Sequence, residues 1–194
     1  EDAFVPEYRL LDGAKARVGQ GPGTLINTAP VYRTPRGGVT STGFAALTVG
    51  AAQGVLQEWL LYTVPRKSRG NAVADDPGTH MIAARSSAEI DAAEALYFGT
   101  VSRAMRTLEA GDTLTDFDLT TARRNVSFAA KLALKAGTRI FNAAGGRALS
   151  KGNPLERQYR NLLGAASHHA MVWERNAMAY GKELFARVNI QGDD

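Results

Sequence analysis

The sequence predicts an all-α protein, an up-down four-helix bundle with an extended N-terminal lead-in. Beyond residue 36, apolar residues recur every three or four positions over long stretches, which is the spacing of one face of an α-helix. Glycine and proline gather instead near the N-terminus, in the runs GQGPG (residues 19–23) and TPRGG (residues 34–38), where they favour turns. We therefore divide the chain into a connection over residues 1–36, with at most one or two short strands, and a helical domain over residues 37–194.

Composition narrows the class of protein further. With 44% hydrophobic residues in 194, the chain can bury a substantial core. It has no cysteine, so disulfides and thiolate metal sites are excluded, and its three histidines lack the spacing of a zinc motif. The net charge is +4, but the charges are interspersed and form no basic block, so no nucleic-acid partner is indicated. No apolar run approaches the length of a membrane span, and we expect a cytoplasmic protein.

The first two helices follow from their apolar stripes. In the first, the predicted inner face ends before Pro65 and consists of Phe44, Leu47, Ala51, Val55, Trp59 and Tyr62. The polar segment RKSRGNAVADDPG then forms a loop. The second helix is predicted to start near Gly78 and to end at AGDTL, with an inner face of Ile90, Ala93, Tyr97, Val101, Ala104 and Leu108.

The last two helices carry capping signals. Thr115 and Asp118 have the spacing of a capping box, so the third helix begins there. Its inner stripe is predicted as Leu119, Ala122, Val126, Ala129, Ala133, Ala136, Ile140 and Ala143, and the glycines at 145 and 146 end or kink it. The fourth opens at Asn153, with Pro154 at the first helical position, and is expected to run to about Phe185.

Two neighbouring stripes follow this predicted last helix. One continues the core, and within it we interpret His169 as a packed imidazole; it consists of Leu155, Tyr159, Leu162, Ala166, His169, Trp173, Ala177, Tyr180 and Leu184. The other carries His168, with Gly164 leaving space one turn before it and Asn161 two turns before it. The pattern alone leaves His168 open between a core residue and a site residue.

Two further features have both a structural and a ligand-binding interpretation. Arg66, Lys67 and Arg69 form a cationic cluster in the loop after the first helix, where they are either solvated or clamp a phosphate. The pair Gly145 and Gly146 either ends a helix or brings backbone N–H groups close to a ligand. Neither pattern decides between its two interpretations.

Three more polar residues have mainly a structural interpretation. Arg157 and Arg160 are expected to pair with Glu156 or with acids on a neighbouring helix. Their functional alternative is to hold structure around a ligand pocket. His80, at a helix start beside a loop, is interpreted as a surface residue.

The order of motifs along almost the whole chain resembles a known family. It runs from VPEYRLLD through a helix and the loop RKSRG to FNAAGGRALSKGNPLERQYRNLLGAASHH. This order is similar to the carboxyl-terminal part of flavin-dependent monooxygenases with the acyl-CoA dehydrogenase fold. These are oxygenase components of two-component systems, among them hydroxylases of phenols and steroid-derived phenols and the dibenzothiophene monooxygenase. The most specific part is residues 153–168, where a Pro-Leu-x-Arg segment leads through Arg and Asn to small residues and a His.

This resemblance implies an activity and a role for the histidine pair. The whole enzyme would take reduced FMN or FAD from a separate flavin reductase and hydroxylate a small aromatic or polycyclic substrate with O2. His168 would lie near the reactive edge of the flavin and assist proton transfer, either from a phenol or to the activated oxygen. His169 would be its structural neighbour.

The resemblance also implies an assembly, because the family binds flavin between subunits. Arg66 or Arg69 would reach the flavin phosphate of a neighbouring subunit, and Gly145 and Gly146 would approach the cofactor from the adjacent subunit. We therefore expect a homodimer or homotetramer.

The chain departs from the family in two respects. No Tyr-Glu-Gly motif follows Tyr180, whereas acyl-CoA dehydrogenases place their glutamate base in such a motif. The family's amino-terminal helical domain and most of its β-domain are absent, so we expect residues 1–36 to be a remnant of that β-domain and the isolated fragment to be inactive. Three hypotheses result, in order: a monooxygenase domain, an acyl-CoA dehydrogenase-like flavin oxidoreductase, and a non-catalytic helical assembly domain.

Overall fold

The computed structural model describes residues 3–39 and 41–188, and almost all of its regular structure is helical. The longer helices are α3 (Thr42–Thr63), α4 (Pro77–Glu109), α5 (Asp116–Ala144), α6 (Pro154–Ala166) and α7 (Trp173–Ala186). Two short helices precede them, α1 (Gly13–Arg17) and α2 (Arg36–Val39). Strands β1 (Lys67–Ser68) and β2 (Asn71–Ala72) form an antiparallel hairpin between α3 and α4. The predicted all-α class is confirmed.

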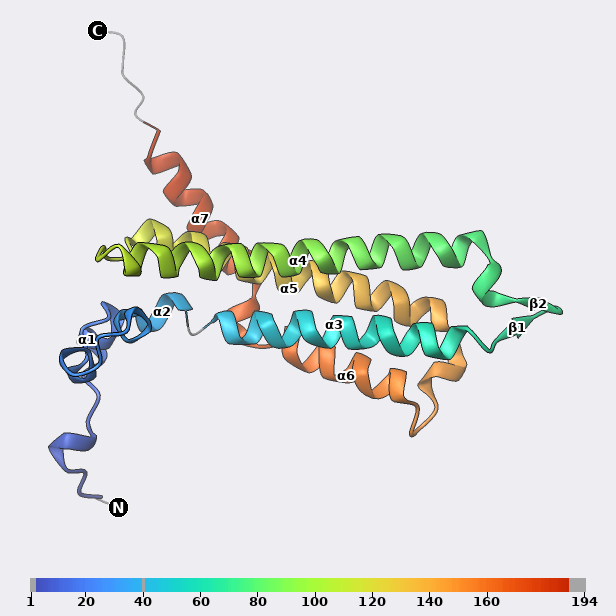
Figure 1. Ribbon diagram of the computed structural model, residues 1–194, viewed down its shortest axis with the longest axis horizontal. Coiled ribbons are helices and arrows are strands. Elements are labelled where there is room, and N and C mark those ends of the chain that lie inside the picture. The colour runs from blue at the N-terminus through green and yellow to red at the C-terminus, as the bar shows by residue number, and fades with distance from the viewer. Residues whose placement is uncertain (1–2, 40, 189–194) are drawn as a thin grey trace, which may run out of the picture.

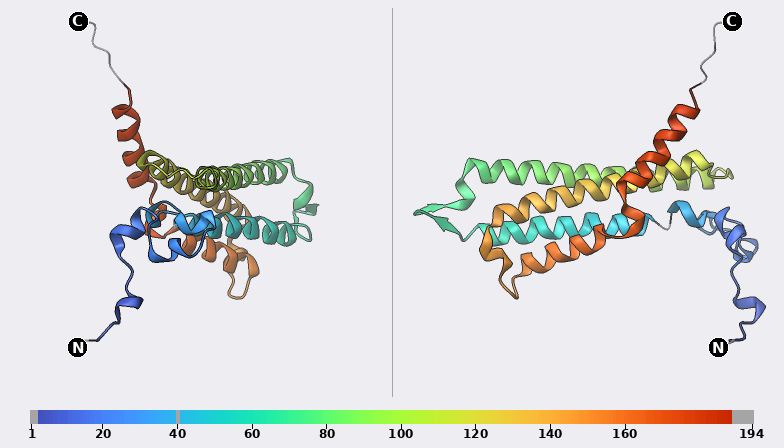
Figure 2. Two further views of the ribbon diagram at one scale, coloured as in Figure 1. Left: turned by 60° about the vertical axis from the view of Figure 1, so that its left-hand side comes forward. Right: turned by 180° about the vertical axis from the view of Figure 1, so that it is seen from behind.

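Helices α3 to α6 lie side by side and alternate in direction, as Figures 1 and 2 show. The arrangement departs from four equal helices, because α6 has only 13 residues and α7 packs against α5 before projecting from the bundle (Figure 1). The main core lies among α3, α4, α5 and α6, and many of its α5 residues are alanines. Alanine at these positions lets the helix axes approach closely.

The buried face of α3 differs from the predicted one. Val55 and Trp59 are buried as expected, but Leu47 is 62% exposed and Phe44 is only half-buried. The buried positions are instead Thr42, Ala45, Thr48, Val49, Ala52, Val55, Trp59 and Thr63. Because α3 is apolar on nearly every side, its periodicity could not decide which side faces the core.

The capping signals predicted for α5 and α6 are confirmed, with Leu155 N–H donating to Asn153 Oδ1 at 3.0 Å, and α4 is capped as well. Asp76 accepts a hydrogen bond from the backbone N–H of Thr79 at the start of α4. At α5, Asp118 N–H donates to Thr115 Oγ1 at 3.2 Å, and Thr115 N–H donates to Asp118 Oδ2 at 2.9 Å. The inner stripe of α5 is buried as predicted up to Ile140. Its last member is wrong, since Ala143 is exposed and Ala144 is buried instead.

One ion-pair cluster joins the middle of α4 to α5. Arg139 Nη2 lies 2.7 Å from Glu89 Oε2, and Arg139 Nη1 donates to Ser86 Oγ at 3.0 Å. Arg85 and Lys135 lie within 4 Å of the same carboxylate. Partial burial acts to raise the pKa of Glu89, but the hydrogen bond and charge of Arg139 and the other cations outweigh it, so the pKa is lowered from 4.5.

The lead-in consists of short helical turns separated by extended residues. Residues 3–36 contain three 3-10 turns, α1 and the start of α2, and no strand. Asp12 begins α1 by accepting hydrogen bonds from Ala14 and Lys15 N–H, and these two bonds lower the pKa of its carboxyl. Prolines open two of the 3-10 turns, which suits their fixed φ. Helix α2 crosses the proposed boundary at residue 36, and the division into two domains stays a prediction.

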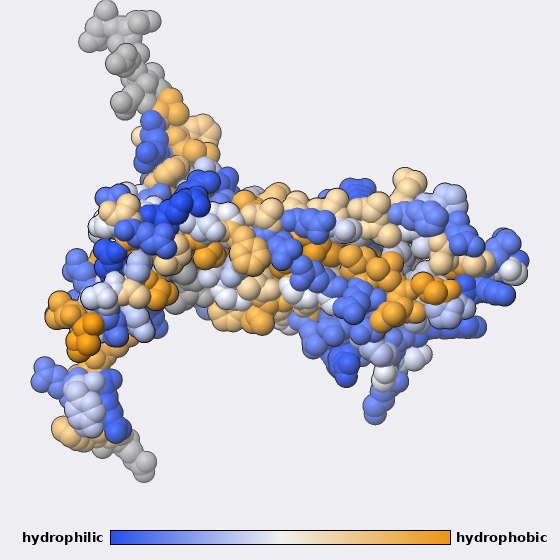
Figure 3. All heavy atoms as spheres, in the orientation of Figure 1, coloured by the Kyte–Doolittle hydropathy of each residue, from blue (hydrophilic) through white to orange (hydrophobic). Residues whose placement is uncertain are grey.

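Polar and apolar side chains alternate over the face of the bundle seen in Figure 3. Among residues 3–39 and 41–188, no helix combines the length and the apolar character that crossing a bilayer requires. Over the same residues, no three side chains of the metal-binding types come together.

Candidate functional site

The predicted fourth helix is interrupted at the histidine pair, and this break creates the candidate site. Helix α6 ends at Ala166, Ser167 Oγ donates back to Leu163 O at 2.7 Å, and His168 adopts an extended backbone with ψ 137°. A 3-10 turn over His169–Met171 follows, and α7 starts at Trp173. The prediction of one continuous helix from Asn153 to about Phe185 is therefore wrong. The same side-chain bond at Thr48, which donates to Phe44 O, does not end α3, so the bond of Ser167 does not by itself account for the break.

The break changes the expected surroundings of both histidines. His169 is exposed, so its interpretation as a packed core imidazole is wrong. His168 is half-buried and caps the 3-10 turn, since Ala170 N–H donates to His168 Nδ1 at 3.2 Å. A ring nitrogen that accepts a hydrogen bond carries no proton, so the neutral ring holds its proton on Nε2.

An aromatic side chain fixes the plane of the His168 ring. Phe44, in the first turn of α3, stacks on it with 3.4 Å between ring centroids and 11° between ring planes. The His169 ring contacts the His168 ring at an interplanar angle of 41°, with 4.3 Å between the two ring centroids. Residues 124 positions apart therefore share one site, and nothing in the local sequence of Phe44 predicts its role.

His168 and Phe44 stand at the wall of an open groove of about 960 Å³ between α3 and α6. Small residues line both sides of the groove, namely Gly43, Ala46, Gly50, Ala51, Gly164 and Ala165. Side-chain donors are available from Gln158, Arg160 and Asn161. The expected ion pair of Arg160 with Glu156 is present at 3.7 Å. Small walls with a few polar groups and one aromatic face suit a flat, heteroaromatic ligand.

The other predicted site residues lie at the opposite end of α3. Arg66 Nη1 donates to Ala144 O at 3.0 Å, and its guanidinium lies 4.7 Å from the Tyr62 ring. Gly145, with φ 76°, ends α5 directly after that carbonyl, and Gly146 opens the following 3-10 turn. Arg66 therefore binds the carbonyl end of α5, where a cation is favoured by the helix dipole.

Arg69 lies apart from this group, at the tip of the β1–β2 hairpin. It is exposed and has a φ of 51°, followed by Gly70 at 88°. Two successive positive φ values are those of a type I′ hairpin turn. The 22 residues of α3 span about 33 Å at 1.5 Å per residue, so Arg66 and Arg69 do not reach His168 within one chain.

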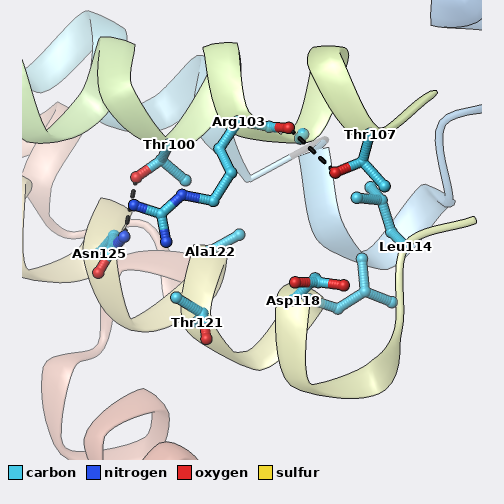
Figure 4. Close-up of a pocket in the computed structure, with 10 residues that line it drawn as sticks. Thr100, Arg103, Thr107, Leu114, Asp118, Thr121, Ala122 and Asn125 are labelled. Atoms are coloured by element: carbon cyan, nitrogen blue, oxygen red, sulfur yellow. Dashed lines mark hydrogen bonds between the residues drawn. The ribbon is translucent and has the colours of Figure 1, made fainter. Parts of the chain in front are cut away.

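A smaller cavity lies between α4 and α5, and polar groups that line it are engaged in bonds that hold the fold. Figure 4 shows Asn125 bonded to Thr100, with Arg103, Thr121 and Asp118 around the space. Asn125 Nδ2 donates to Thr100 Oγ1 at 2.9 Å, and the Asp118 carboxylate serves the capping box. Its volume of about 30 Å³ is enough for ordered water.

These features define a class of protein: a helical domain with an open groove whose wall includes an imidazole stacked on an aromatic ring. Residues 42–173 match the family model described as the acyl-CoA dehydrogenase C-terminal domain. The chain belongs to this family.

Individual proteins of known name are also similar to this chain. The chain is 33% identical to the oxygenase subunit HsaA, a flavin-dependent monooxygenase of Rhodococcus jostii, covering 95% of this chain and 49% of that protein. It is 27% identical to the oxygenase component of an FADH2-dependent resorcinol hydroxylase of a Rhizobium strain, covering 95% and 48%. The crystal structure of a 3-HSA hydroxylase from Rhodococcus superposes with a TM-score of 0.88 at 32% identity, covering 96% and 49%. The chain spans about half the length of these relatives.

Proposed function

We propose that this chain is the C-terminal domain of a reduced-flavin-dependent monooxygenase that hydroxylates an aromatic or polycyclic substrate with O2 in the cytoplasm. The observation that carries the proposal is the fixed imidazole of His168 at the wall of the α3–α6 groove. Relatives named as oxygenase components of such enzymes support the same class of reaction.

The lining of the groove is compatible with the cofactor, reduced FMN or FAD. A ring system of this kind needs flat, narrow walls and donors for its carbonyl oxygens. Glycines at positions 50 and 164 leave open space where a Cβ would stand, and Asn161 and Gln158 offer amide donors. When bound, the flavin supplies the activation of O2, and the chain supplies orientation and proton control.

The tautomer of His168 indicates which ring nitrogen is free to bond to a ligand. Its Nδ1 lone pair accepts the Ala170 N–H, so Nε2–H is the group that can reach a ligand. We assign Nε2–H the role of donating a hydrogen bond to the substrate's phenol oxygen, which stabilises negative charge there. Phe44 holds the ring plane in place for this bond.

The second group of residues is assigned to a neighbouring subunit's cofactor. Arg66 and Arg69 would contact a flavin phosphate, and Gly145 and Gly146 would approach the flavin, in a homodimer or homotetramer. The 33 Å or so along α3 between this group and His168 fits a site shared between two chains. A separate flavin reductase would deliver the reduced cofactor. Light scattering that finds only monomers of the intact protein would contradict the assembly.

The test is the substitution His168→Ala in the intact protein, supplied with chemically reduced flavin and a phenol. We expect hydroxylated product to fall by about 10²- to 10³-fold, the usual effect of removing one hydrogen-bond donor from a developing negative charge. His80→Ala is the matched control, because His80 is an exposed histidine in the first turn of α4, where its ring bonds to Ala74 O and does not line the groove. Unchanged hydroxylation at neutral pH would remove the role of His168. Electron transfer from an acyl-CoA to a dye would favour the dehydrogenase instead.

A further inference from the structure

A second hollow lies on the other side of the histidine turn from the groove. It has a volume of about 400 Å³ and is bordered by α2, α5, α7 and the 3-10 turn between α6 and α7. Arg123 enters from α5, Arg175 from α7 and His169 from the turn.

The lining of this hollow has a positive charge that no acid balances. None of its lining residues is Asp or Glu. Within the described ranges 3–39 and 41–188, no carboxylate lies within ion-pairing distance of Arg123 or Arg175. Two guanidinium groups around one hollow repel each other, and an anion placed between them removes that cost.

The walls of the hollow are held in place by bonds on both sides. Arg123 Nε donates to Gly37 O at 2.9 Å, and a Cβ at Gly37 would lie 3.0 Å from Arg123 Nη2. Buried Asn176 donates to Ala170 O at 3.0 Å, which ties α7 to the histidine turn. Among the described residues no hydrogen bond engages Arg175, so its guanidinium is available to a ligand.

We propose that this hollow binds the anionic oxygen group of a small ligand, a carboxylate or a phosphate, through Arg123 and Arg175. Guanidinium groups match both oxyanions with paired N–H donors. The hollow borders the His168 turn, because the rings of His168 and His169 are in contact. Two ligands of the proposed enzyme can supply the anionic group: an aromatic substrate that carries a carboxylate, and the flavin, which carries a phosphate. This inference rests on the proposed function only in the choice of probes, which are aromatic compounds and flavins.

The test compares probe pairs that differ in charge, by calorimetric titration of the intact protein. The first pair is 4-hydroxybenzoate and 4-hydroxybenzamide, and the second is FMN and riboflavin. In Arg175→Gln we expect the preference for the charged member of one pair to fall about tenfold, the effect of one lost charge-assisted hydrogen bond. Loss in the first pair identifies a substrate carboxylate, and loss in the second identifies the flavin phosphate. Arg175→Lys, which keeps the charge, should retain part of the preference.

Arg157→Gln is the matched control, since Arg157 is an exposed arginine on α6 outside this hollow. It should leave both preferences unchanged. The inference is overturned if the wild-type protein prefers neither charged probe, or if Arg175→Gln keeps both preferences. Because binding is measured without turnover, a failure of the hydroxylation assay leaves this result interpretable.

Discussion

The helix pair α3 and α6 is closed at one end and open at the other. Over the first nine residues of α6, Leu155 and Leu162 are buried in one core cluster with Val55 and Trp59, and Tyr159 stacks on Phe141 at 4.2 Å between centroids. Where α6 ends, the two helices expose glycines and Leu47 along the groove that reaches His168.

The difference between the two ends lies in residue size. The closed end interlocks large side chains with small ones, and Gly137 of α5 leaves the space that Leu162 fills. The open end has small residues on both helices, so neither helix fills the space between them. Because the closely packed end stabilises the helix pair, the other end can contain an open groove without unfolding the domain.

The largest expected effect comes from removing Leu162, whose exposure is 0%. We expect Leu162→Ala to lower the free energy of unfolding by about 3 kcal/mol, through lost burial and a residual cavity. Leu163→Ala is the control at the next position, which is 41% exposed, and should cost less than about 0.5 kcal/mol. Urea unfolding of the intact protein measures both. Equal losses would show that the closed end is not the better packed one.

A methyl group at Gly137 tests the same contact from the opposite helix. Its Cβ would overlap the Cδ2 atom of buried Leu162. We expect Gly137→Ala to destabilise the protein by roughly 2 kcal/mol, because the packed leucine has little room to move. The midpoint of urea unfolding checks this value. Stabilisation by Gly137→Ala would mean that the helix interface relaxes, contrary to a closed end.

The Glu89–Arg139 pair tests a contact between α4 and α5 that depends on charge rather than size. The pKa of Glu89 is lowered from 4.5, so the unfolded chain binds this proton more tightly than the folded one. The pair therefore stabilises the fold above about pH 4.5 and loses this contribution as the pH falls through the lowered pKa. We expect Glu89→Gln to cost roughly 1.5 kcal/mol at pH 7, and less below pH 4.5.

Unfolding midpoints measured from pH 7 down to pH 3 check this dependence. Glu156→Gln is a comparison at an ion pair whose arginine is largely exposed, and its effect should be near zero. A cost of Glu89→Gln that is constant with pH would argue against the ion pair as its source.

The smallest effect on stability is expected at the open end. Gly164 is exposed on α6 and nothing lies within 4 Å of a Cβ there. Gly164→Ala should stabilise the helix by up to about 1 kcal/mol, while the added methyl narrows the groove. Unfolding and flavin titration are measured on the same protein. A gain in stability with unchanged flavin affinity would place the flavin outside this groove.

Several features could be predicted from sequence because they depend on neighbours along the chain. The capping box of Thr115 and Asp118, Pro154 at the start of α6 and the buried alanines of α5 all follow from local spacing. Motif order along the chain likewise led to the family, which residues 42–173 confirm. His168 was singled out by that resemblance, and its role stays a prediction.

The remaining features depend on contacts between distant residues. The end of α6 at Ser167 carries no glycine or proline, so a continuous apolar stripe concealed it. Phe44 and His168, which stack, come from separate elements, and so do Arg123 and Arg175, which line one hollow.

The sequence by itself therefore determined the all-α class, most helix starts and the family, because hydrophobic period and capping are local properties. Tertiary structure alone decided which side of α3 is buried, where the last helix breaks, and which polar groups share a hollow. The physical reason is that α3 is apolar on nearly every side and a helix face becomes interior only when a partner covers it. The choice was made by the packing of α5 and α6.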